Sequence, residues 1–297
     1  MNSDNRDDFS ELRALFRSSL FWRADRVVEP LAWVEHVPFA FWVVDILRPK
    51  TIVELGTHTG VSYSAMCQAV AKLELNTKCY AIDTWRGDEH AGFYPEAVYS
   101  ELAAYNESKY SAFSRLVRST FSDAALHFED ETIDLLHIDG LHTYEAVHDD
   151  FATWLPKLSK NAVVLFHDTN VREQQFGVYL LWSEVQKKYR SFEFVHCNGL
   201  GVLGLSEHYP PALELLFQAN EKYGHTAAVR DIFSNLGRAL RLSAESSITL
   251  PNIQSALAER DRYISSLLAS PSWRMTKPLR SIQKRLKFLN SKNGSPK

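Results

Sequence analysis

Two acidic residues at the ends of apolar runs are the side chains in this sequence best suited to chemistry. Asp139 follows the run 133–138, and Asp168 comes shortly after the run 161–166. If these runs are neighbouring strands of a parallel sheet, the two carboxylates lie close together at one edge of it. Carboxylates that close repel each other unless a cation or a proton lies between them. The pair therefore predicts a site for Mg²⁺ or a similar cation, although the nearby histidines would also accept Mn²⁺ or Zn²⁺.

Two histidines flank these acids in the sequence. His142 is three residues after Asp139, and His167 directly precedes Asp168. A cation held by the acids could bind two sugar hydroxyls and lower the pKa of one of them. Imidazole titrates near neutral pH, so either histidine could remove the proton; we favour His142 as the base, with Asp139 and His167 as further catalytic candidates. The alternative is that the acids only cap helices and that the histidines have no chemical role.

A glycine-containing turn, residues 54–62, is the second candidate site. It follows the apolar run 51–53 and precedes a helical pattern from Tyr63 to Lys72. In open α/β sheets such a turn lies at the carboxyl end of a strand, where nucleotide-like ligands bind. The turn lacks the third glycine of the dinucleotide fingerprint, and Glu54 stands where the amino group of a ligand would lie. The turn therefore favours S-adenosylmethionine over NAD, and the alternative is a glycine turn without a ligand.

Two further loops carry side chains that suit a nucleoside. Asp83 ends the run 78–83, where an acid can accept hydrogen bonds from both ribose hydroxyls or can equally be a solvated cap. Phe121 could lie against an adenine ring; alternatively it belongs to the core and Ser122 caps a helix. His90, in a loop bracketed by glycines, is either a substrate-side group or an exposed loop residue.

The elements that position these residues follow from the hydrophobic periodicity. Short apolar runs alternate with helical patterns, which predicts a mostly parallel sheet covered by helices on both faces. We predict strands at 51–55, 78–83, 114–118, 133–138, 161–166, 191–196 and 200–205, and helices at 36–48, 61–75, 93–107, 143–155 and 172–189. Cys197-Asn198-Gly199 separates the last two strands, and its Asn-Gly pair predicts an antiparallel hairpin.

Composition limits the class of protein. The 297 residues are 45% hydrophobic, enough for one large core with appendages. The net charge of −3 argues against a general nucleic-acid binder. Three scattered cysteines predict buried, reduced thiols. The N-terminus is unlike a signal peptide, and no apolar run approaches the roughly 18–20 residues needed to span a bilayer, so we expect a cytoplasmic protein.

The chain divides into three predicted regions: an N-terminal helical lead-in (1–34), the α/β domain (35–206) and a helical, basic extension (207–297). Residues 259–297 hold ten Lys or Arg residues and two acidic residues, a net charge of +8, so residues 1–258 carry −11. Apolar residues at heptad-like steps between 250 and 268 cover too few heptads to predict a coiled coil. We expect residues 290–297 to be disordered.

Residues 35–206 resemble the class I S-adenosylmethionine-dependent methyltransferases. The closer resemblance is to the branch that includes macrocin O-methyltransferase-like and cephalosporin hydroxylase-like proteins. It rests on the strings Glu54-Leu55-Gly56…Gly60-Val61-Ser62, Asp83-Thr84-Trp85…Gly87-Asp88-Glu89-His90-Ala91-Gly92, Asp139-Gly140-Leu141-His142-Thr143-Tyr144 and His167-Asp168-Thr169. It implies a Rossmann-like α/β fold: seven mostly parallel strands with an antiparallel C-terminal hairpin, helices on both faces, and here a helical C-terminal extension.

The resemblance also implies which residues touch the ligands. The implied cofactor contacts are Glu54, Gly56, Gly60, Ser62 and Asp83, completed by Thr57, Thr84 and Phe121 of the same loops; the implied metal contacts are Asp139 and Asp168. Cation-dependent relatives usually have an Asp or Asn directly after the second metal acid, where this chain has Thr169. Either His142 or His167 takes that place, or the site holds no metal.

The tail has a resemblance of its own. Residues 270–280 are similar to an S-x-S-W-R-x-T-x-P-L-R segment at the ends of bacterial glycosyltransferases and companion enzymes of polysaccharide assembly. A basic helix with apolar residues could lie on an anionic membrane surface or dock on a partner such as a glycosyltransferase of the same pathway. The apolar positions in question are Trp273, Leu279, Ile282, Leu286 and Phe288. The alternative is a solvated charged helix.

Three functions compete at this point. The leading prediction is methyl transfer from S-adenosylmethionine to a sugar hydroxyl in bacterial surface glycan synthesis. The second is a non-catalytic module that binds cofactor or glycan as a scaffold in a polysaccharide-synthesis complex. The third is an NAD-dependent oxidoreductase, against which the missing third glycine speaks.

Overall fold

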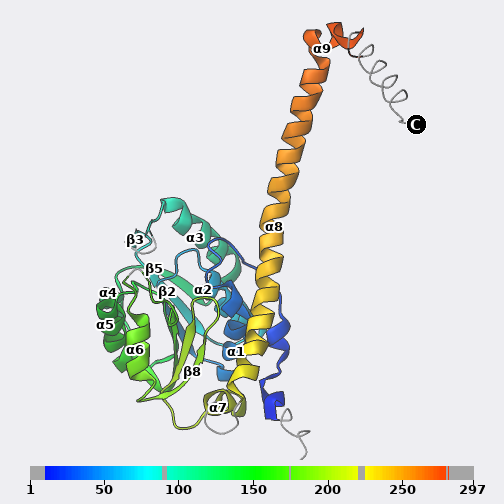
Figure 1. Ribbon diagram of the computed structural model, residues 1–297. Helices are drawn as coiled ribbons and strands as arrows, with labels where there is room; N and C mark the ends of the chain where they lie inside the picture. Colours follow the sequence, from blue (N-terminus) through cyan, green and yellow to red (C-terminus); the bar gives the residue numbers. More distant parts are fainter. Residues whose placement is uncertain (1–10, 89–91, 174, 220–224, 279, 281–297) are drawn as a thin grey trace, which may run out of the picture. The chain divides into compact units, whose positions relative to one another are not determined.

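The computed structural model describes residues 11–88, 92–173, 175–219, 225–278 and 280 (Figure 1). Several expectations fall on the remaining positions. They concern the loop residue His90, the polar start of the chain, the expected disorder of 290–297, and the tail positions Leu279, Ile282, Leu286 and Phe288.

A seven-stranded sheet in the order β5-β2-β1-β6-β7-β9-β8 forms the centre of the α/β domain. The strands are β1 (Thr51–Leu55), β2 (Lys78–Asp83), β5 (Ser114–Arg118), β6 (Ile133–Ile138), β7 (Leu158–His167), β8 (Arg190–Phe194) and β9 (Leu200–Gly204); β3 (Gly87–Asp88) and β4 (Gly92–Phe93) form a separate short ribbon. The neighbours in the series β5-β2-β1-β6-β7 pair in parallel, and β9 runs antiparallel between β7 and β8. The predicted mostly parallel sheet with an antiparallel C-terminal hairpin is confirmed.

Helices cover both faces of the sheet, as Figure 1 shows. The first core contains side chains of α1 (Val37–Leu47) and α2 (Val61–Lys72), and the second contains side chains of α4 (Phe121–Ala125), α5 (Tyr144–Trp154) and α6 (Val178–Val185). Successive strand residues alternate between the two cores: Ile52 faces the first and Val53 the second. This alternation explains why the central strands are largely apolar, since both of their faces are buried.

The remaining helices lie before, between and after these elements. They are η1 (Glu11–Leu15), η2 (Ser18–Phe21), η3 (Val34–His36), α3 (Glu96–Tyr110), η4 (Leu155–Lys157), α7 (Pro211–Gln218), α8 (Thr226–Ala269) and α9 (Pro271–Met275). Within the described part of the N-terminal lead-in, the helices are short 3₁₀ turns. Among the described residues, no helix has both the length and the apolar character that crossing a bilayer requires.

The turn between β8 and β9 shapes the loop that follows β7. Cys197, Asn198 and Gly199 all have positive φ angles, of 48°, 72° and 95°. Asn and Gly tolerate this left-handed conformation well. The turn offers two carbonyl oxygens to the neighbouring loop: Gly199 accepts from the Asp168 N–H at 3.1 Å, and Asn198 accepts from the Asn170 N–H at 2.8 Å. The hairpin therefore holds the backbone that carries Asp168.

One predicted helix is shorter than expected. We predicted a helix from residue 172, but α6 begins at Val178. A Cβ at Gly177 would overlap the backbone nitrogen of Tyr144, and the Gly177 N–H donates to the His142 carbonyl oxygen at 2.7 Å. The chain before α6 is therefore held as a loop against the start of α5.

The chain forms two compact units, residues 1–242 and 243–297. In the first unit, α7 and the first turns of α8 contribute Leu213, Val229 and Phe233 to the core. In the second unit, the described chain is helical, and the heptad-like residues are exposed. These are Leu250, Ile253, Leu257, Ile264 and Leu267. The predicted helical extension is confirmed.

Candidate active site

A cavity of about 620 Å³ lies at the carboxyl ends of the central strands. Sites for small molecules usually measure about 300–1,000 Å³. The cavity wall combines the loops singled out in the sequence: Gly56, Thr57 and Ser62 after β1, Asp83 and Thr84 after β2, Phe121 after β5, Asp139 and His142 after β6, and His167 and Asp168 after β7. Of the predicted site residues, Glu54 and Gly60 do not line it.

The turn after β1 packs directly on the loop after β6. Gly56 has a φ angle of 82°, and a Cβ there would overlap the Asp139 carbonyl oxygen and lie 2.6 Å from its carbonyl carbon. Gly60 has a φ angle of 77° and lies against the Leu102 side chain. Both positions need glycine, because a side chain would be strained at this φ and would collide with its neighbour.

Asp83 ties the turn after β1 to β2. Its Oδ2 accepts hydrogen bonds from the Thr57 N–H at 2.8 Å and the His58 N–H at 2.9 Å, and its Oδ1 accepts from the Trp85 N–H at 2.7 Å. A carboxylate offers about four acceptor positions, so three backbone donors leave room for one more. Asp83 thus shapes the cavity wall itself, and its contact with a ribose remains a prediction.

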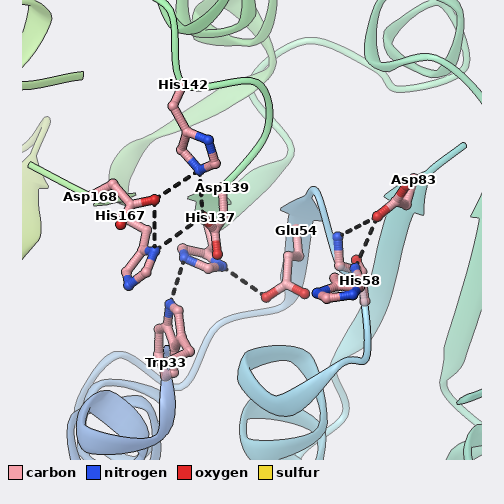
Figure 2. Close-up of polar contacts among 10 residues, drawn as sticks. Trp33, Glu54, His58, Asp83, His137, Asp139, His142, His167 and Asp168 are labelled. Atoms are coloured by element: carbon pink, nitrogen blue, oxygen red, sulfur yellow. Dashed lines mark hydrogen bonds and ion pairs between the residues drawn. The ribbon is translucent and has the colours of Figure 1, made fainter. Parts of the chain in front are cut away.

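Glu54 lies behind the cavity in a chain of buried hydrogen bonds (Figure 2). Strand pairing sets Glu54 opposite His137, and the His137 Nδ1 lies 2.8 Å from the Glu54 Oε2. The Trp33 indole N–H donates to the His137 Nε2 at 3.1 Å. The Nε2 therefore carries no proton, and the Nδ1 donates to the carboxylate. Trp33 thereby sets the tautomer of His137.

The burial of Glu54 affects the protonation of its carboxyl group. Burial raises the pKa of its fully buried carboxyl, and His137 and Ser62 partly offset the rise. Within the described residues, the Glu54 Oε1 has no hydrogen-bond partner. An unpaired buried carboxylate oxygen is an acceptor that an amino group of a ligand could use. The predicted contact between Glu54 and the cofactor remains a prediction.

The structure brings Asp139, His142, His167 and Asp168 together, and Figure 2 shows their contacts. The His142 Nε2 lies 2.8 Å from the Asp168 Oδ2 and 3.5 Å from the Asp139 Oδ1. The His167 Nδ1 lies 3.1 Å from the Asp139 Oδ1 and 3.4 Å from the Asp168 Oδ2. We call these four residues the carboxylate–histidine cluster.

Local structure holds each member of the cluster in place. The Asp139 N–H donates to the Leu55 carbonyl at 2.8 Å. His142 stacks on Phe176, with ring centroids 4.5 Å apart, and precedes Thr143, which caps the start of α5. Asp168 has a φ angle of 60°. Such strained backbone conformations often accompany functional sites.

The cluster perturbs the titration of all its members. Burial lowers the pKa of His142, but its hydrogen bonds with Asp139 and Asp168 outweigh this and raise the pKa to about 9. Burial also lowers the pKa of His167, and the charges of the same two acids raise it well above its usual value. Burial raises the pKa of Asp139 and Asp168, but the charge of His167 and its hydrogen bonds lower both below their usual value. The carboxylates and the imidazoles of the cluster thus favour each other's charged forms.

The donor atoms of the cluster also fit a divalent cation. Asp139, His142 and Asp168 each offer a ligand atom, and these atoms lie within 4.8 Å of one another. The Asp168 Oδ1 is buried without a hydrogen-bond partner among the described residues. Two carboxylates and an imidazole suit Mg²⁺, Mn²⁺ or Zn²⁺. Thr169, at the position of the missing third acid, is fully buried, whereas His142 faces both acids.

We expect the stability of the protein in EDTA to fall as the pH rises from about 6.5 to about 9. The pKa of folded His142 is about 9, above the unfolded value of about 6.5, so the folded state keeps a proton that the unfolded chain releases. Thermal unfolding across this range measures the fall. His142→Gln should reduce the fall but not abolish it, because the raised pKa of His167 contributes to the same loss; the exposed His148→Gln on α5 should leave the fall unchanged. A constant melting temperature in the wild type would contradict the prediction.

Several residues of the site carry no signal that we recognised in the sequence. Trp33 and Pro30 enter the cavity wall from the N-terminal segment, and Arg26 of that segment donates to the Thr59 carbonyl at 3.1 Å. His137 could have been noticed as a polar residue within a buried strand, opposite the equally unusual Glu54. The long-range contacts of Trp33 have no such local signal.

Phe121 belongs partly to the core and partly to the cavity wall, and its contact with an adenine ring remains a prediction. It lines the cavity and packs against the second core. The cap of α4 is Thr120, whose hydroxyl accepts from the Asp123 N–H at 3.2 Å, and not Ser122. Cys67 and Cys79 are buried free thiols, as predicted, whereas Cys197 is partly exposed in the hairpin turn.

Comparisons with known proteins extend this picture. Residues 53–169 match a family model described as a methyltransferase domain. A stretch of 172 residues, 58% of this chain, is 54% identical to the uncharacterized protein y4gI of Sinorhizobium fredii, and it spans 19% of that protein. This chain thus matches less than a quarter of its curated relative's length.

Two solved structures are similar to this chain at low identity. One is the SAH-bound methyltransferase PaMTH1 of Podospora anserina, 13% identical, with a TM-score of 0.45 over 68% of this chain and 97% of that chain. The other is the O-methyltransferase TomG of Streptomyces achromogenes, involved in tomaymycin synthesis, in complex with SAM. It is 13% identical, with a TM-score of 0.45 over 67% of this chain and 94% of that chain.

The family match covers β1 to β7 and every member of the carboxylate–histidine cluster. The sheet carries the antiparallel β9 that the resemblance implies. Residues 53–169, which hold most of the sheet and the whole carboxylate–histidine cluster, are therefore similar to a methyltransferase domain.

Proposed function

We propose that this protein transfers a methyl group from S-adenosylmethionine to a hydroxyl oxygen of a sugar. The observation that carries the proposal is the carboxylate–histidine cluster, which lines the same cavity as the turn after β1. In the reaction the hydroxyl oxygen attacks the methyl carbon, a C–O bond forms, and the C–S bond breaks to release S-adenosylhomocysteine. The hydroxyl also loses its proton. The protein therefore has to align donor and acceptor and to accept that proton.

The described residues divide these tasks between the two sides of the cavity. The turn after β1, held by Asp83, would bind the cofactor, and Asp139 and Asp168 would bind a cation. When bound, the cation would supply positive charge that lowers the pKa of a coordinated hydroxyl. His142 faces the cavity and is the candidate base, a role that requires its neutral form. His167 is nearly fully buried and lies against both carboxylates.

The sugar acceptor and the glycan pathway are the finer part of the proposal. Paired carboxylates with a cation suit neighbouring hydroxyls, which sugars offer. The tail segment 270–280 supports a role beside glycosyltransferases in surface polysaccharide assembly, and the net charge of +8 over 259–297 supports contact with the inner face of the membrane.

Calorimetry combined with a transfer assay tests the proposal. We expect S-adenosylhomocysteine to bind with and without EDTA, NADH not to bind, and labelled methyl to reach a glycan acceptor only when Mg²⁺ or a similar cation is present. Absence of S-adenosylhomocysteine binding under every condition would contradict the proposed methyltransferase activity. Binding of S-adenosylhomocysteine without methyl transfer to any glycan would favour the scaffold function. Methyl transfer that EDTA leaves unchanged would contradict the requirement for a cation.

A further inference from the structure

Asp150 is an acidic residue in the cavity wall that the carboxylate–histidine cluster does not include. It lies in the middle of α5, so it is not a helix cap. The point where Gly140 would carry a Cβ is 3.3 Å from the Asp150 Oδ2 and 2.5 Å from the Phe121 ring. Asp150 and Phe121 therefore flank the same backbone position.

The carboxylate of Asp150 has no hydrogen bond or ion pair with any described residue. Its neighbour Asp149 has a side chain 81% exposed, which lies 3.3 Å from His148. Burial raises the pKa of Asp150 to about 7, and the charge of Asp149 adds to the rise. Keeping an acid in a cavity wall without a partner costs free energy, which a hydrogen-bond donor on a ligand would offset.

The position of Asp150 indicates which part of a ligand it meets. Phe121 follows β5, the edge strand of the parallel part of the sheet, while Asp139 and Asp168 follow β6 and β7. Asp83, at the end of β2, lies between these two ends in the strand order. A cofactor with its methyl group near the cluster and its ribose near Asp83 would extend its base toward Phe121.

The chemistry of a purine then restricts the contact. An ionised carboxylate accepts hydrogen bonds and cannot donate one. The ring nitrogens of adenine in a nucleoside are acceptors, and its exocyclic amine is the donor group on its edge. Phe121 offers a flat apolar surface for the ring, and Gly140 has no side chain to obstruct it.

We propose that Asp150 accepts a hydrogen bond from the exocyclic amine of the cofactor's adenine and so determines the specificity of the site for this base. The proposal rests on the proposed function, because it assumes that the cavity holds S-adenosylmethionine.

Two ligands that differ at this amine test the proposal. S-inosylhomocysteine has a carbonyl oxygen where S-adenosylhomocysteine has the amine. The wild type should bind S-adenosylhomocysteine about 10- to 100-fold more tightly, because the analogue would set an oxygen against the carboxylate and its N1–H could reach Asp150 only if the base shifted. Asp150→Ala should bind S-adenosylhomocysteine about tenfold more weakly and lose the preference. Asp150→Asn can donate to the carbonyl oxygen, so it should shift the preference toward the inosine ligand.

Asp149→Asn is the matched control, because it removes the same charge from the adjacent, exposed position of α5. It should keep the preference for S-adenosylhomocysteine, although loss of the Asp149 charge lowers the pKa of Asp150. Melting temperatures at or above that of the wild type would show that the Asp150 variants fold. Two results would overturn the proposal and leave the proposed function standing: equal binding of both ligands by the wild type, or an unchanged preference in Asp150→Ala. A wild type that binds no S-adenosylhomocysteine would overturn both.

Discussion

Asp168→Asn is expected to lower the rate of methyl transfer by at least about 100-fold and to leave the affinity for S-adenosylhomocysteine nearly unchanged. The substitution removes the charge that faces His142 at 2.8 Å and His167 at 3.4 Å. Asn also tolerates the positive φ angle at this position. The substitution should therefore lower the rate of methyl transfer and have little effect on the stability of the fold. Steady-state transfer of a labelled methyl group and calorimetry measure the two quantities separately.

Asp130→Asn is a suitable control for this experiment. Asp130 is an exposed acid that pairs with Lys157 at 2.7 Å, and it does not line the cavity. We expect this variant to keep wild-type activity, since exposed ion pairs contribute little to stability. A rate within tenfold of the wild type for Asp168→Asn would contradict a catalytic role for the cluster. Loss of S-adenosylhomocysteine binding in parallel with activity would point to a structural role.

Gly56→Ala is expected to weaken S-adenosylhomocysteine binding by at least about 100-fold and to lower the melting temperature. The left-handed conformation alone costs roughly 1–2 kcal/mol for a residue with a Cβ. In addition, the new methyl group would overlap the Asp139 carbonyl oxygen. The loop after β6 must then move, and this loop carries both Asp139 and His142. Calorimetry and thermal unfolding measure the two effects.

Gly92→Ala is a control that introduces the same backbone strain as Gly56→Ala without a collision between the new methyl group and a neighbour. Gly92 has a φ angle of 80°, close to the 82° of Gly56, but a Cβ there would have no neighbour within 4 Å among the described residues. The variant should therefore incur a similar conformational cost and keep its affinity for S-adenosylhomocysteine. Equal losses of affinity in both variants would show that the contact between the turn after β1 and the loop after β6 is not what shapes the site.

The strands β1, β2, β5 and β6 begin and end at the residues predicted from the sequence. Their apolar runs are short and are bounded by turn residues, so local periodicity was sufficient. The helices were less predictable. α3 begins at Glu96 because the extended Pro95 precedes it, and α6 begins late because Gly177 packs on α5.

Much of the candidate site could also be predicted from local sequence patterns. Asp139 and Asp168 follow strands that the strand order places side by side, so a rule about strand ends was enough to bring them together. The antiparallel position of β9 followed from the Asn198-Gly199 pair, whose conformational preference is also local. These features depend on residues close to one another along the chain.

Only the tertiary structure decided which groups complete the site. The indole of Trp33 reaches His137, 104 residues away, and the carboxylate of Asp83 binds backbone N–H groups of the turn after β1. Helical spacing sets Asp150 on the same face of α5 as the buried Val147 and Trp154. Only the packing decides that Asp150 and Phe121 lie on either side of Gly140. Such contacts arise from the packing of distant segments, and the identity of a buried partner cannot be read from the periodicity of either segment alone.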